Sequence, residues 1–354
     1  MSLFLVLNPG STSTKVAVYE DLQLRCSGTI RHTAQELGSF TSVISQRTFR
    51  LDTIMTYLQE QGYDGSEFDA VIAIGGLLKK VSSGAYRVND AMLQDLEQQK
   101  YGEHAANLGA ILAQDFAGRF HIPAYVGDPI TVDEMQPVAR MSGHPLLPRY
   151  GRTHTLNHKR IAYSVSTELG KEYQDCRLII AHLGGGISIG AHAGGQIIDS
   201  TSSRGEGAFS MDRSGQLNSW ELAKLCFSGK YDKKTVLKML NGEGGVWAYL
   251  GTKDFRQVEE LMDQGNELAS QVFHALVYQV AKEIGAMAVV LQGRFDAIVL
   301  TGGIVFSKKF VAELTDYIGF LGKIVLRPGE EEMESLCFYL HAITQGTMEP
   351  KEYC

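Results

Sequence analysis

The stretch LFLVLNPGSTSTKVAVY, residues Leu3–Tyr19, decides the fold. Its apolar run, polar turn and second apolar run predict a strand, a turn and a strand. The same order of features returns in RLIIAHLGGGISIGAHAGGQII, residues Arg177–Ile198. Two similar hairpins about 175 residues apart indicate a duplicated domain, with the second copy beginning near residue 155.

Runs typical of strands alternate with longer stretches typical of helices through both halves of the chain. This alternation predicts an α/β architecture. The expected strands beyond the two hairpins are Phe68–Ile74, Pro123–Val126 and Asp296–Leu300. The expected helices are a stretch of about Ala91–Phe120, then Ser219–Phe227, Lys233–Leu240 and two across Phe255–Leu291.

The composition excludes several classes of partner and location. The chain has 33 Lys and Arg residues and 40 Asp and Glu residues, which gives a net charge of −7. A nucleic-acid-binding protein typically carries an excess of positive charge, so this class is disfavoured. Five scattered cysteines without a C-x-x-C motif favour neither a disulfide framework nor a zinc site, as expected in a reducing cytoplasm. The start MSLFLVLNPG does not resemble a signal peptide, and the apolar runs are shorter than the ~20 residues of a membrane span. We expect a cytoplasmic protein without a membrane partner.

Several common catalytic motifs are absent. The sequence has no G-x-x-x-x-G-K-[ST], no H-E-x-x-H and no G-x-G-x-x-G after the first strand, which disfavours a P-loop, a zincin and a Rossmann enzyme. The segment GISIG, Gly186–Gly190, matches the G-x-S-x-G elbow of hydrolases. Its alternating isoleucines and the following Gly194-Gly195 turn favour a hairpin strand instead.

Three glycine-rich turns follow predicted strands: NPGSTSTK (Asn8–Lys15), HLGGG (His182–Gly186) and TGGI (Thr301–Ile304). Small residues let backbone N–H groups approach an anion, and the hydroxyls and Lys15 add donors. The third turn lies at the end of a strand, where α/β folds bind ligands. Together the turns favour a nucleotide held between two domains over three merely structural turns. The 38 glycines of the chain are consistent with many such turns.

Long motifs in the same order resemble the acetate/butyrate kinase family of the actin-like ATPase superfamily, and the resemblance covers the full length. They are NPGSTSTK, HLGGG, DSTSSRGEGAFSMDRSG (Asp199–Gly215), LTGGI (Leu300–Ile304) and RPGEEEME (Arg327–Glu334). Three further segments are closer to the butyrate kinases than to the acetate kinases of this family: EHAANLGAILA (Glu103–Ala113), TLNHK (Thr155–Lys159) and GGVWAYLGTKD (Gly244–Asp254).

The resemblance implies two duplicated actin-like (ribonuclease H-like) ATPase domains with an interdomain cleft. The first would cover 1–154, joined by a C-terminal helix at about 331–354, and the second 155–330. It also implies a homo-oligomer, a dimer or larger, and a reversible Mg²⁺-dependent in-line phosphoryl transfer between ATP and butyrate, giving butyryl phosphate and ADP. A carboxylic acid with a pKa of about 4–5 is already ionised at pH 7, so this nucleophile needs no general base.

Roles for individual residues follow from the resemblance. Asn8, Ser11, Ser13 and Lys15 would line the phosphate and metal site of the first domain, and Gly184, Gly185 and Gly186 would form the second phosphate turn. Gly302 and Gly303 match the adenosine turn, His182 would donate to the transferring phosphoryl group, and Arg213 would stabilise its equatorial oxygens. His154 matches a further active-site histidine, Asp128 an acid near the metal, and Glu330 a metal ligand together with Asn8.

Some assignments stay open at this stage. The metal ligand is one of Glu330, Glu331 and Glu332, and His158 competes with His154. The family generally carries Arg or His where this chain has Ile74, which leaves open a preference for acetate, propionate or a branched acid. Lys79 and Lys80 follow closely in the sequence. A further alternative is a degenerate actin-like switch that binds nucleotide without acyl transfer.

Overall fold

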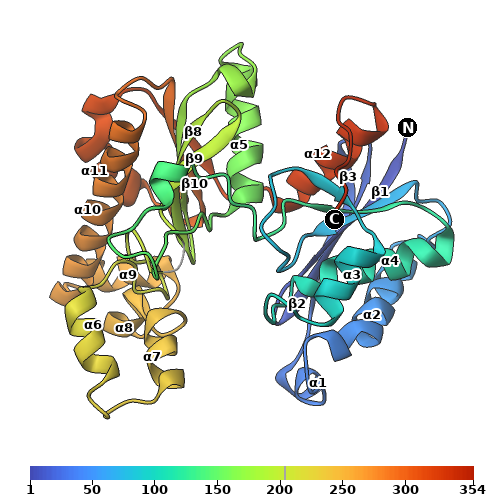
Figure 1. The fold of residues 1–354 in the computed structure, drawn as a ribbon, viewed down its shortest axis with the longest axis horizontal. Coiled ribbons are helices and arrows are strands. Elements are labelled where there is room, and N and C mark those ends of the chain that lie inside the picture. The colour runs from blue at the N-terminus through green and yellow to red at the C-terminus, as the bar shows by residue number, and fades with distance from the viewer. Residues whose placement is uncertain (203–204) are drawn as a thin grey trace. The chain divides into compact units, whose positions relative to one another are not determined.

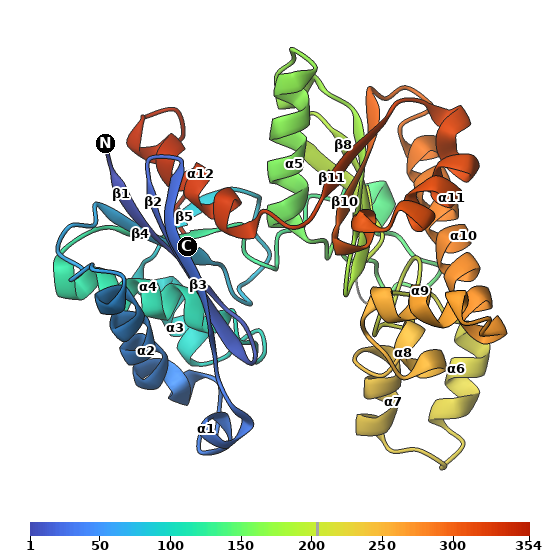
Figure 2. The ribbon, with the colours of Figure 1, turned by 180° about the vertical axis from the view of Figure 1, so that it is seen from behind.

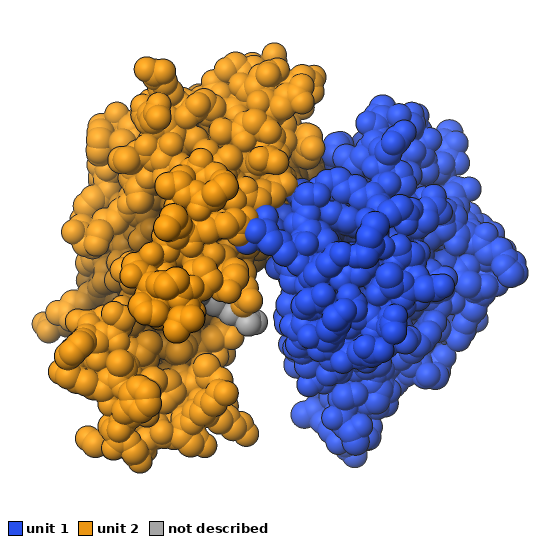
Figure 3. Space-filling model, in the orientation of Figure 1, with its two compact units in different colours: residues 1–133, 331–354 blue, residues 134–330 orange. Residues whose placement is uncertain are grey.

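Contacts within the chain divide it into two units. In the computed structural model, which describes residues 1–202 and 205–354, unit 1 comprises Met1–Asp133 and Glu331–Cys354. Unit 2 comprises Glu134–Glu330 (Figure 3). The C-terminal segment therefore belongs to unit 1.

The first boundary differs from the one expected between residues 154 and 155. The Glu134 carboxylate accepts a hydrogen bond from the backbone N–H of Ile197 at 3.0 Å and pairs with the Lys159 ammonium at 2.6 Å. The backbone N–H of Gln136 donates to the carbonyl of Ile198 at 2.9 Å. These contacts bind the segment after residue 133 to the second sheet, a tertiary effect that the sequence pattern does not carry.

The sheet of unit 1 begins with the hairpin predicted from Leu3–Tyr19. Its strand order is β3-β2-β1-β4-β6-β5, with β1 to β3 antiparallel, β4 parallel to β1, β6 parallel to β4, and β5 antiparallel to β6. The strands are β1 (Leu3–Pro9), β2 (Ser13–Glu20), β3 (Gln23–Arg31), β4 (Ala70–Ile74), β5 (Ala85–Arg87) and β6 (Ala124–Gly127).

The sheet of unit 2 repeats this topology. Its order is β9-β8-β7-β10-β11, with an antiparallel meander from β7 to β9 and with β10 and β11 parallel to β7. The strands are β7 (Leu178–Leu183), β8 (Ile187–Ala193), β9 (Gln196–Ser200), β10 (Ala297–Gly302) and β11 (Ile324–Pro328). The duplication inferred from the two hairpins is confirmed, and so is the assignment of GISIG to a strand.

Helices cover both faces of each sheet (Figure 1). Unit 1 contains α1 (Ala34–Gly38), α2 (Arg47–Glu60), α3 (Asp90–Glu97), α4 (Asn107–Phe120) and α12 (Glu332–Thr344). Seen from both sides, α2, α3 and α4 lie on one face and α12 on the other (Figures 1 and 2). The single helix expected over Ala91–Phe120 is wrong, because Gln99 and Gly102 adopt positive φ between α3 and α4.

Successive side chains of a strand point to opposite faces of its sheet, which explains how unit 2 buries both faces of one sheet. Its helices are α5 (Thr155–Glu168), α6 (Ser219–Cys226), α7 (Lys233–Leu240), α8 (Gly245–Leu250), α9 (Phe255–Asp263), α10 (Glu267–Val290) and α11 (Lys308–Ile318). In β7, Ile179 and Ala181 join the core formed with α10, whereas Leu178 and Ile180 join the core formed with α5. Among the described residues, each helix is too short or too polar to cross a membrane.

Candidate active site

The ends of β7 and β10 bring two of the predicted glycine turns together. Thr301 pairs with His182 in the parallel register, so the chain leaves both strands at the same edge. Gly302 follows with a φ of 97°, and a Cβ at this position would collide with the backbone carbonyl of Leu183. Only glycine meets both conditions. The predicted adenosine turn therefore lies beside the turn of Gly184–Gly186.

A cavity of about 910 Å³ opens at this place, and Gly184, Gly185 and Gly303 line it. Its volume falls within the ~300–1,000 Å³ typical of small-molecule sites. Its wall also contains apolar and charged side chains, namely Met211, Lys253, Asp254, Phe255, Arg256, Glu259, Ile304 and Phe306. Apolar surface beside cations and exposed backbone suits a nucleotide, which has a flat base and an anionic tail.

His182 is held in one tautomer by a neighbour that the sequence analysis missed. The Asn157 amide Nδ2 lies 2.8 Å from His182 Nδ1 and donates to Thr301 Oγ1 at 3.3 Å. Thr301 gives its single proton to the Gly329 carbonyl at 3.2 Å, so it can only accept from Asn157. The atom facing His182 is therefore the NH₂ group, and His182 Nδ1 accepts. This leaves Nε2 as the ring nitrogen that donates on the other side.

Glu330 lies on the opposite side of this imidazole. Its Oε1 is 3.3 Å from His182 Nε2, and its side chain is 40% exposed. Oε1 would also lie 3.3 Å from a Cβ at Gly184. The carboxylate therefore faces both the phosphate turn and the proton of His182.

His154 and His158 differ sharply in accessibility. His154 is partly exposed and stacks on His182, with ring centroids 3.9 Å apart and planes inclined by 16°. Desolvation, together with His182 and Arg213, holds the pKa of His154 well below its usual value. His158 is fully buried behind it. Of the two candidates, His154 is the one that a ligand can reach.

Arg213 lies against the phosphate turn. A Cβ on Gly186 would be only 2.5 Å from its Nη1 atom, so the guanidinium covers the turn closely. The backbone carbonyl of Arg213 accepts a hydrogen bond from the N–H of Ser210 at 2.9 Å. The Ser210 hydroxyl in turn donates to the Gly185 carbonyl at 2.8 Å. These contacts tie the segment that carries Arg213 to the turn. Within unit 2, the structure thus gathers His182, His154, Arg213, Glu330 and the glycines of both turns.

The polar cluster of unit 1 forms at the end of β1. Asn8 Nδ2 donates to Glu332 Oε2 at 2.7 Å, and the same oxygen lies 3.6 Å from Lys15 Nζ. The glutamate that contacts Asn8 is therefore Glu332, whereas Glu330 contacts His182. Glu331 uses its backbone carbonyl to accept from the N–H of Ser335 at 2.8 Å.

Arg50 organises the turn that contains Ser11 and Ser13, and the sequence analysis missed it. Arg50 is fully buried, and its guanidinium donates to the carbonyls of Gly10 at 2.8 Å, Ser13 at 3.0 Å and Ser11 at 3.2 Å. It also donates to Thr14 Oγ1 at 3.1 Å. Because these carbonyls point inward to Arg50, the turn is held from behind by a buried cation, an arrangement that favours an anion on its outer side.

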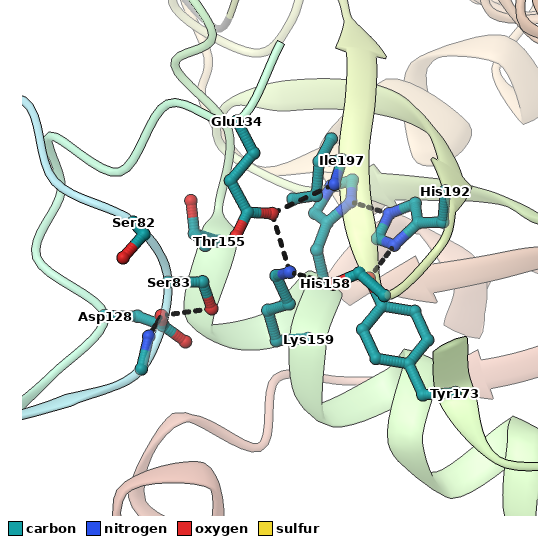
Figure 4. A network of polar contacts seen from close by, with 12 residues as sticks. Ser82, Ser83, Asp128, Glu134, Thr155, His158, Lys159, Tyr173, His192 and Ile197 are labelled. Atoms are coloured by element: carbon teal, nitrogen blue, oxygen red, sulfur yellow. Dashed lines mark hydrogen bonds and ion pairs between the residues drawn. The ribbon is translucent and has the colours of Figure 1, made fainter. Parts of the chain in front are cut away.

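Asp128 occupies a different environment from the other predicted site residues. It is buried, with Oδ1 accepting from Ser83 Oγ at 2.7 Å and the N–H of Gly84 at 2.9 Å (Figure 4). Its Oδ2 accepts from the Tyr339 hydroxyl at 2.6 Å. These three donors show that Asp128 links the loop before β5 to α12.

The positions around Ile74 bear on the acyl group. Ile74 is partly buried at the end of β4, next to Gly127 of β6. Lys80 pairs with Asp133 at 3.3 Å, and Lys79 lies 5.0 Å from the centre of the Tyr353 ring. Both lysines are engaged in contacts within unit 1.

Comparison with known proteins identifies the family. The model of the acetokinase family matches residues 139–325. "Butyrate kinase 2" of Clostridium acetobutylicum is 44% identical over 350 residues, covering 99% of this chain and 98% of the relative. "Probable butyrate kinase" of Listeria monocytogenes is 43% identical over 350 residues, covering 99% of both chains.

Solved structures agree on the fold. An acetate kinase of Porphyromonas gingivalis aligns with a TM-score of 0.78 at 20% identity, covering 97% of this chain and 100% of the other. A propionate kinase of Francisella tularensis aligns with a TM-score of 0.76 at 19% identity, covering 95% and 98%. The predicted two-domain actin-like ATPase fold is confirmed. This chain belongs to the acetokinase family.

Proposed function

We propose that the protein is a butyrate kinase, which transfers a phosphoryl group reversibly between ATP and butyrate to give butyryl phosphate and ADP. The observation that carries this proposal is the cluster of His182, Arg213 and Glu330 around the Gly184–Gly186 turn, at the cavity that Gly303 also lines. The full-length relatives named butyrate kinase support the acyl group.

The arrangement suits a reaction whose main barrier is electrostatic. An ionised carboxylate must approach an anionic γ-phosphate, and positioned donors and cations lower that barrier. We assign the Nε2–H of His182 and the guanidinium of Arg213 to the oxygens of the transferring group. The N–H groups of Gly184–Gly186 would bind the nucleotide phosphates, and Gly302 and Gly303 would bind the adenosine end.

The residues of unit 1 would contribute further binding groups. We propose that Asn8, Ser11, Ser13 and Lys15 bind phosphate and the solvated metal. Ile74 offers an apolar surface where the resemblance expects an arginine or histidine, consistent with a four-carbon acid. Asp128, with three donors on its carboxylate, would act by holding its loop.

Mg²⁺ would be held by few protein ligands. Among the described residues, no group of three or more His, Cys, Asp or Glu side chains is arranged to hold a metal. This fits Mg²⁺, which keeps several waters and binds through one or two carboxylates plus substrate phosphates. We propose Glu330 as the protein carboxylate, because it is partly exposed and lies beside the phosphate turn. When bound, the ion would neutralise charge on the phosphates.

Replacing Glu330 with glutamine is expected to raise the Mg²⁺ concentration for half-maximal activity at least about tenfold, because a neutral amide binds a hard cation weakly. The matched variant Glu332→Gln should change this concentration much less, since Glu332 is already neutralised by Lys15. Titration of activity with Mg²⁺ measures both. A larger shift for Glu332→Gln would move the metal ligand to that residue.

A panel of straight and branched acids of two to five carbons, with ATP and Mg²⁺, tests the function. We expect the highest kcat/KM for butyrate and at least a tenfold lower value for acetate, because one methylene in an apolar pocket is worth about 10–200-fold. Acyl phosphate is trapped as hydroxamate. A maximum at acetate, propionate or a branched acid would select another kinase of this family. ATP binding without acid-dependent ADP release would instead indicate a nucleotide-binding switch.

We also propose that the enzyme works in the cytoplasm as a homo-oligomer, at least a dimer, as its resemblance implies. None of its five cysteines forms a disulfide bond, as expected in a reducing compartment. Its net charge of −7 makes nucleic acid an unsuitable partner.

A further inference from the structure

A chain of hydrogen bonds runs from Tyr173 through unit 2 to His154. The Tyr173 hydroxyl lies 2.8 Å from His192 Nδ1, and His192 Nε2 lies 3.1 Å from His158 Nδ1. Figure 4 shows these contacts beside the Glu134–Lys159 pair. His158 Nε2 is 3.0 Å from Ser188 Oγ, which is 2.8 Å from His154 Nδ1. Of these residues, only His154 is matched to the active site by the resemblance to the family.

The residues that form this chain of hydrogen bonds between Tyr173 and His154 are buried and uncharged. Ser188, His158 and His192 have no exposed surface, and Tyr173 is 4% exposed. Burial lowers the pKa of His158 to about 3 and holds that of His192 well below its usual value. Each imidazole therefore carries one proton at neutral pH, and each contact in the chain holds one proton.

One proton per contact couples all the tautomers. Ser188 has a single proton and also accepts from the backbone N–H of His154 at 3.3 Å, so it donates to one imidazole and accepts from the other. If Tyr173 donates, every histidine in the chain carries its proton on Nε2. If every hydrogen bond points in the opposite direction, each of the three histidines carries its ring proton on Nδ1. No mixed arrangement satisfies all the contacts.

Two features select the first direction. The Lys159 ammonium, 5.2 Å from the centre of the Tyr173 ring, makes the phenol a stronger donor toward His192. The Lys159 position is fixed by Glu134 at 2.6 Å and by the Gly195 carbonyl at 2.8 Å. In addition, the Nε2–H form is the tautomer that a neutral histidine side chain prefers in water, and this direction gives it to all three histidines.

We propose that Tyr173, His192, His158 and Ser188 are positioning residues that hold His154 neutral with its proton on Nε2. The ring nitrogen that is left for a ligand is then a donor, and it lies on an imidazole stacked against His182, which Asn157 holds in the same tautomer. The two stacked rings can then both donate to one anionic oxygen. The role in phosphoryl transfer rests on the proposed function, whereas the tautomer does not.

The tautomer can be read directly in the enzyme without substrate. With ¹⁵N-labelled histidine, two-bond ¹H–¹⁵N correlation spectra distinguish a protonated ring nitrogen from an unprotonated one. His154 is assigned by its absence from the spectrum of His154→Gln. We expect Nδ1 of His154 to be unprotonated and Nε2 to be protonated. The opposite pattern would overturn the proposal, whichever acid the enzyme uses.

Tyr173→Phe removes the donor that sets the direction. Without the Tyr173 hydroxyl, the hydrogen bonds can point in either direction, so the His154 signals should shift toward a mixture of tautomers. We expect kcat to fall about 10–100-fold with the KM values for ATP and acid within about twofold, as for other residues that orient a functional histidine. A His154 spectrum identical to that of the unaltered enzyme would overturn the proposal.

Two matched variants separate positioning from packing. Tyr163→Phe removes a phenol from a ring that packs against Tyr173, at a centroid distance of 5.0 Å, but not from the chain. It should leave the His154 tautomer and kcat unchanged. His158→Gln keeps an acceptor toward His192 and a donor toward Ser188, so it should preserve the tautomer. Equal spectral changes in Tyr163→Phe and Tyr173→Phe would show that packing, and not the chain of hydrogen bonds, sets the tautomer, and would overturn the proposal.

Discussion

Arg213→Ala is expected to lower kcat by about a thousandfold while the protein stays folded. A fixed arginine that stabilises charge on a transferring phosphoryl group is worth about 10³–10⁵ in kcat. In this chain the guanidinium covers Gly186 at the phosphate turn, so its loss should affect the transition state more than ground-state binding. Steady-state kinetics with butyrate and ATP measure the change.

Arg213→Lys provides the graded comparison. Lysine keeps the charge but loses the planar fork that binds two oxygens, so we expect an intermediate kcat. Circular dichroism and thermal unfolding of both variants check the fold. Near-normal turnover in Arg213→Ala would remove this residue from the catalytic role.

Arg50→Met is expected to be the most destabilising single change among those considered, at about 3 kcal/mol or more. The substitution leaves the carbonyls of Gly10, Ser11 and Ser13 and the hydroxyl of Thr14 without their buried donor. An unsatisfied buried polar group costs about 1–3 kcal/mol; Ser13 keeps the N–H of Gly10 and Thr14 keeps His32, but the carbonyls of Gly10 and Ser11 lose the Arg50 donor. Urea unfolding followed by circular dichroism measures the loss. Binding of ATP should weaken as well, because the turn loses the cation behind it.

Arg47→Met is the matched control on the same helix. Arg47 is 41% exposed, and its Nη1 pairs with Glu97 at 2.8 Å while its fork also binds Asp115. Such a pair near the surface is worth about 1 kcal/mol or less. Comparable urea midpoints for the two variants would show that the Gly10–Thr14 turn does not depend on Arg50.

The two sheets show which parts of the fold the sequence pattern predicts. The hairpin of Leu3–Tyr19 and its repeat at Arg177–Ile198 predicted the duplicated α/β fold, because strand alternation and glycine turns are local properties. The helical stretch predicted over Ala91–Phe120 is interrupted at Gln99 and Gly102, where a polar segment turns with positive φ between α3 and α4. The domain boundary was misplaced because Glu134 finds its partners far along the chain, at Lys159 and Ile197.

The candidate site divides in the same way. The glycine-rich turn marked His182 from the sequence, whereas Arg213 and Glu330 were assigned from the resemblance to the family. Arg50 had no such signal, and Asn157 lay inside the TLNHK segment without a role of its own. Both residues acquire a role only from what they contact in the folded protein.

By itself, the sequence determined the duplicated α/β fold and the glycine turns at the strand ends, because these depend on local periodicity and backbone freedom. The family followed from the resemblance of its ordered motifs. Only the tertiary structure decided which glutamate contacts Asn8, which histidine a ligand can reach, and how the proton of His182 is held. Those outcomes depend on burial and on single-proton hydrogen bonds between residues distant in the chain. A hydrogen bond selects its partner by position in space, which the order of residues does not display.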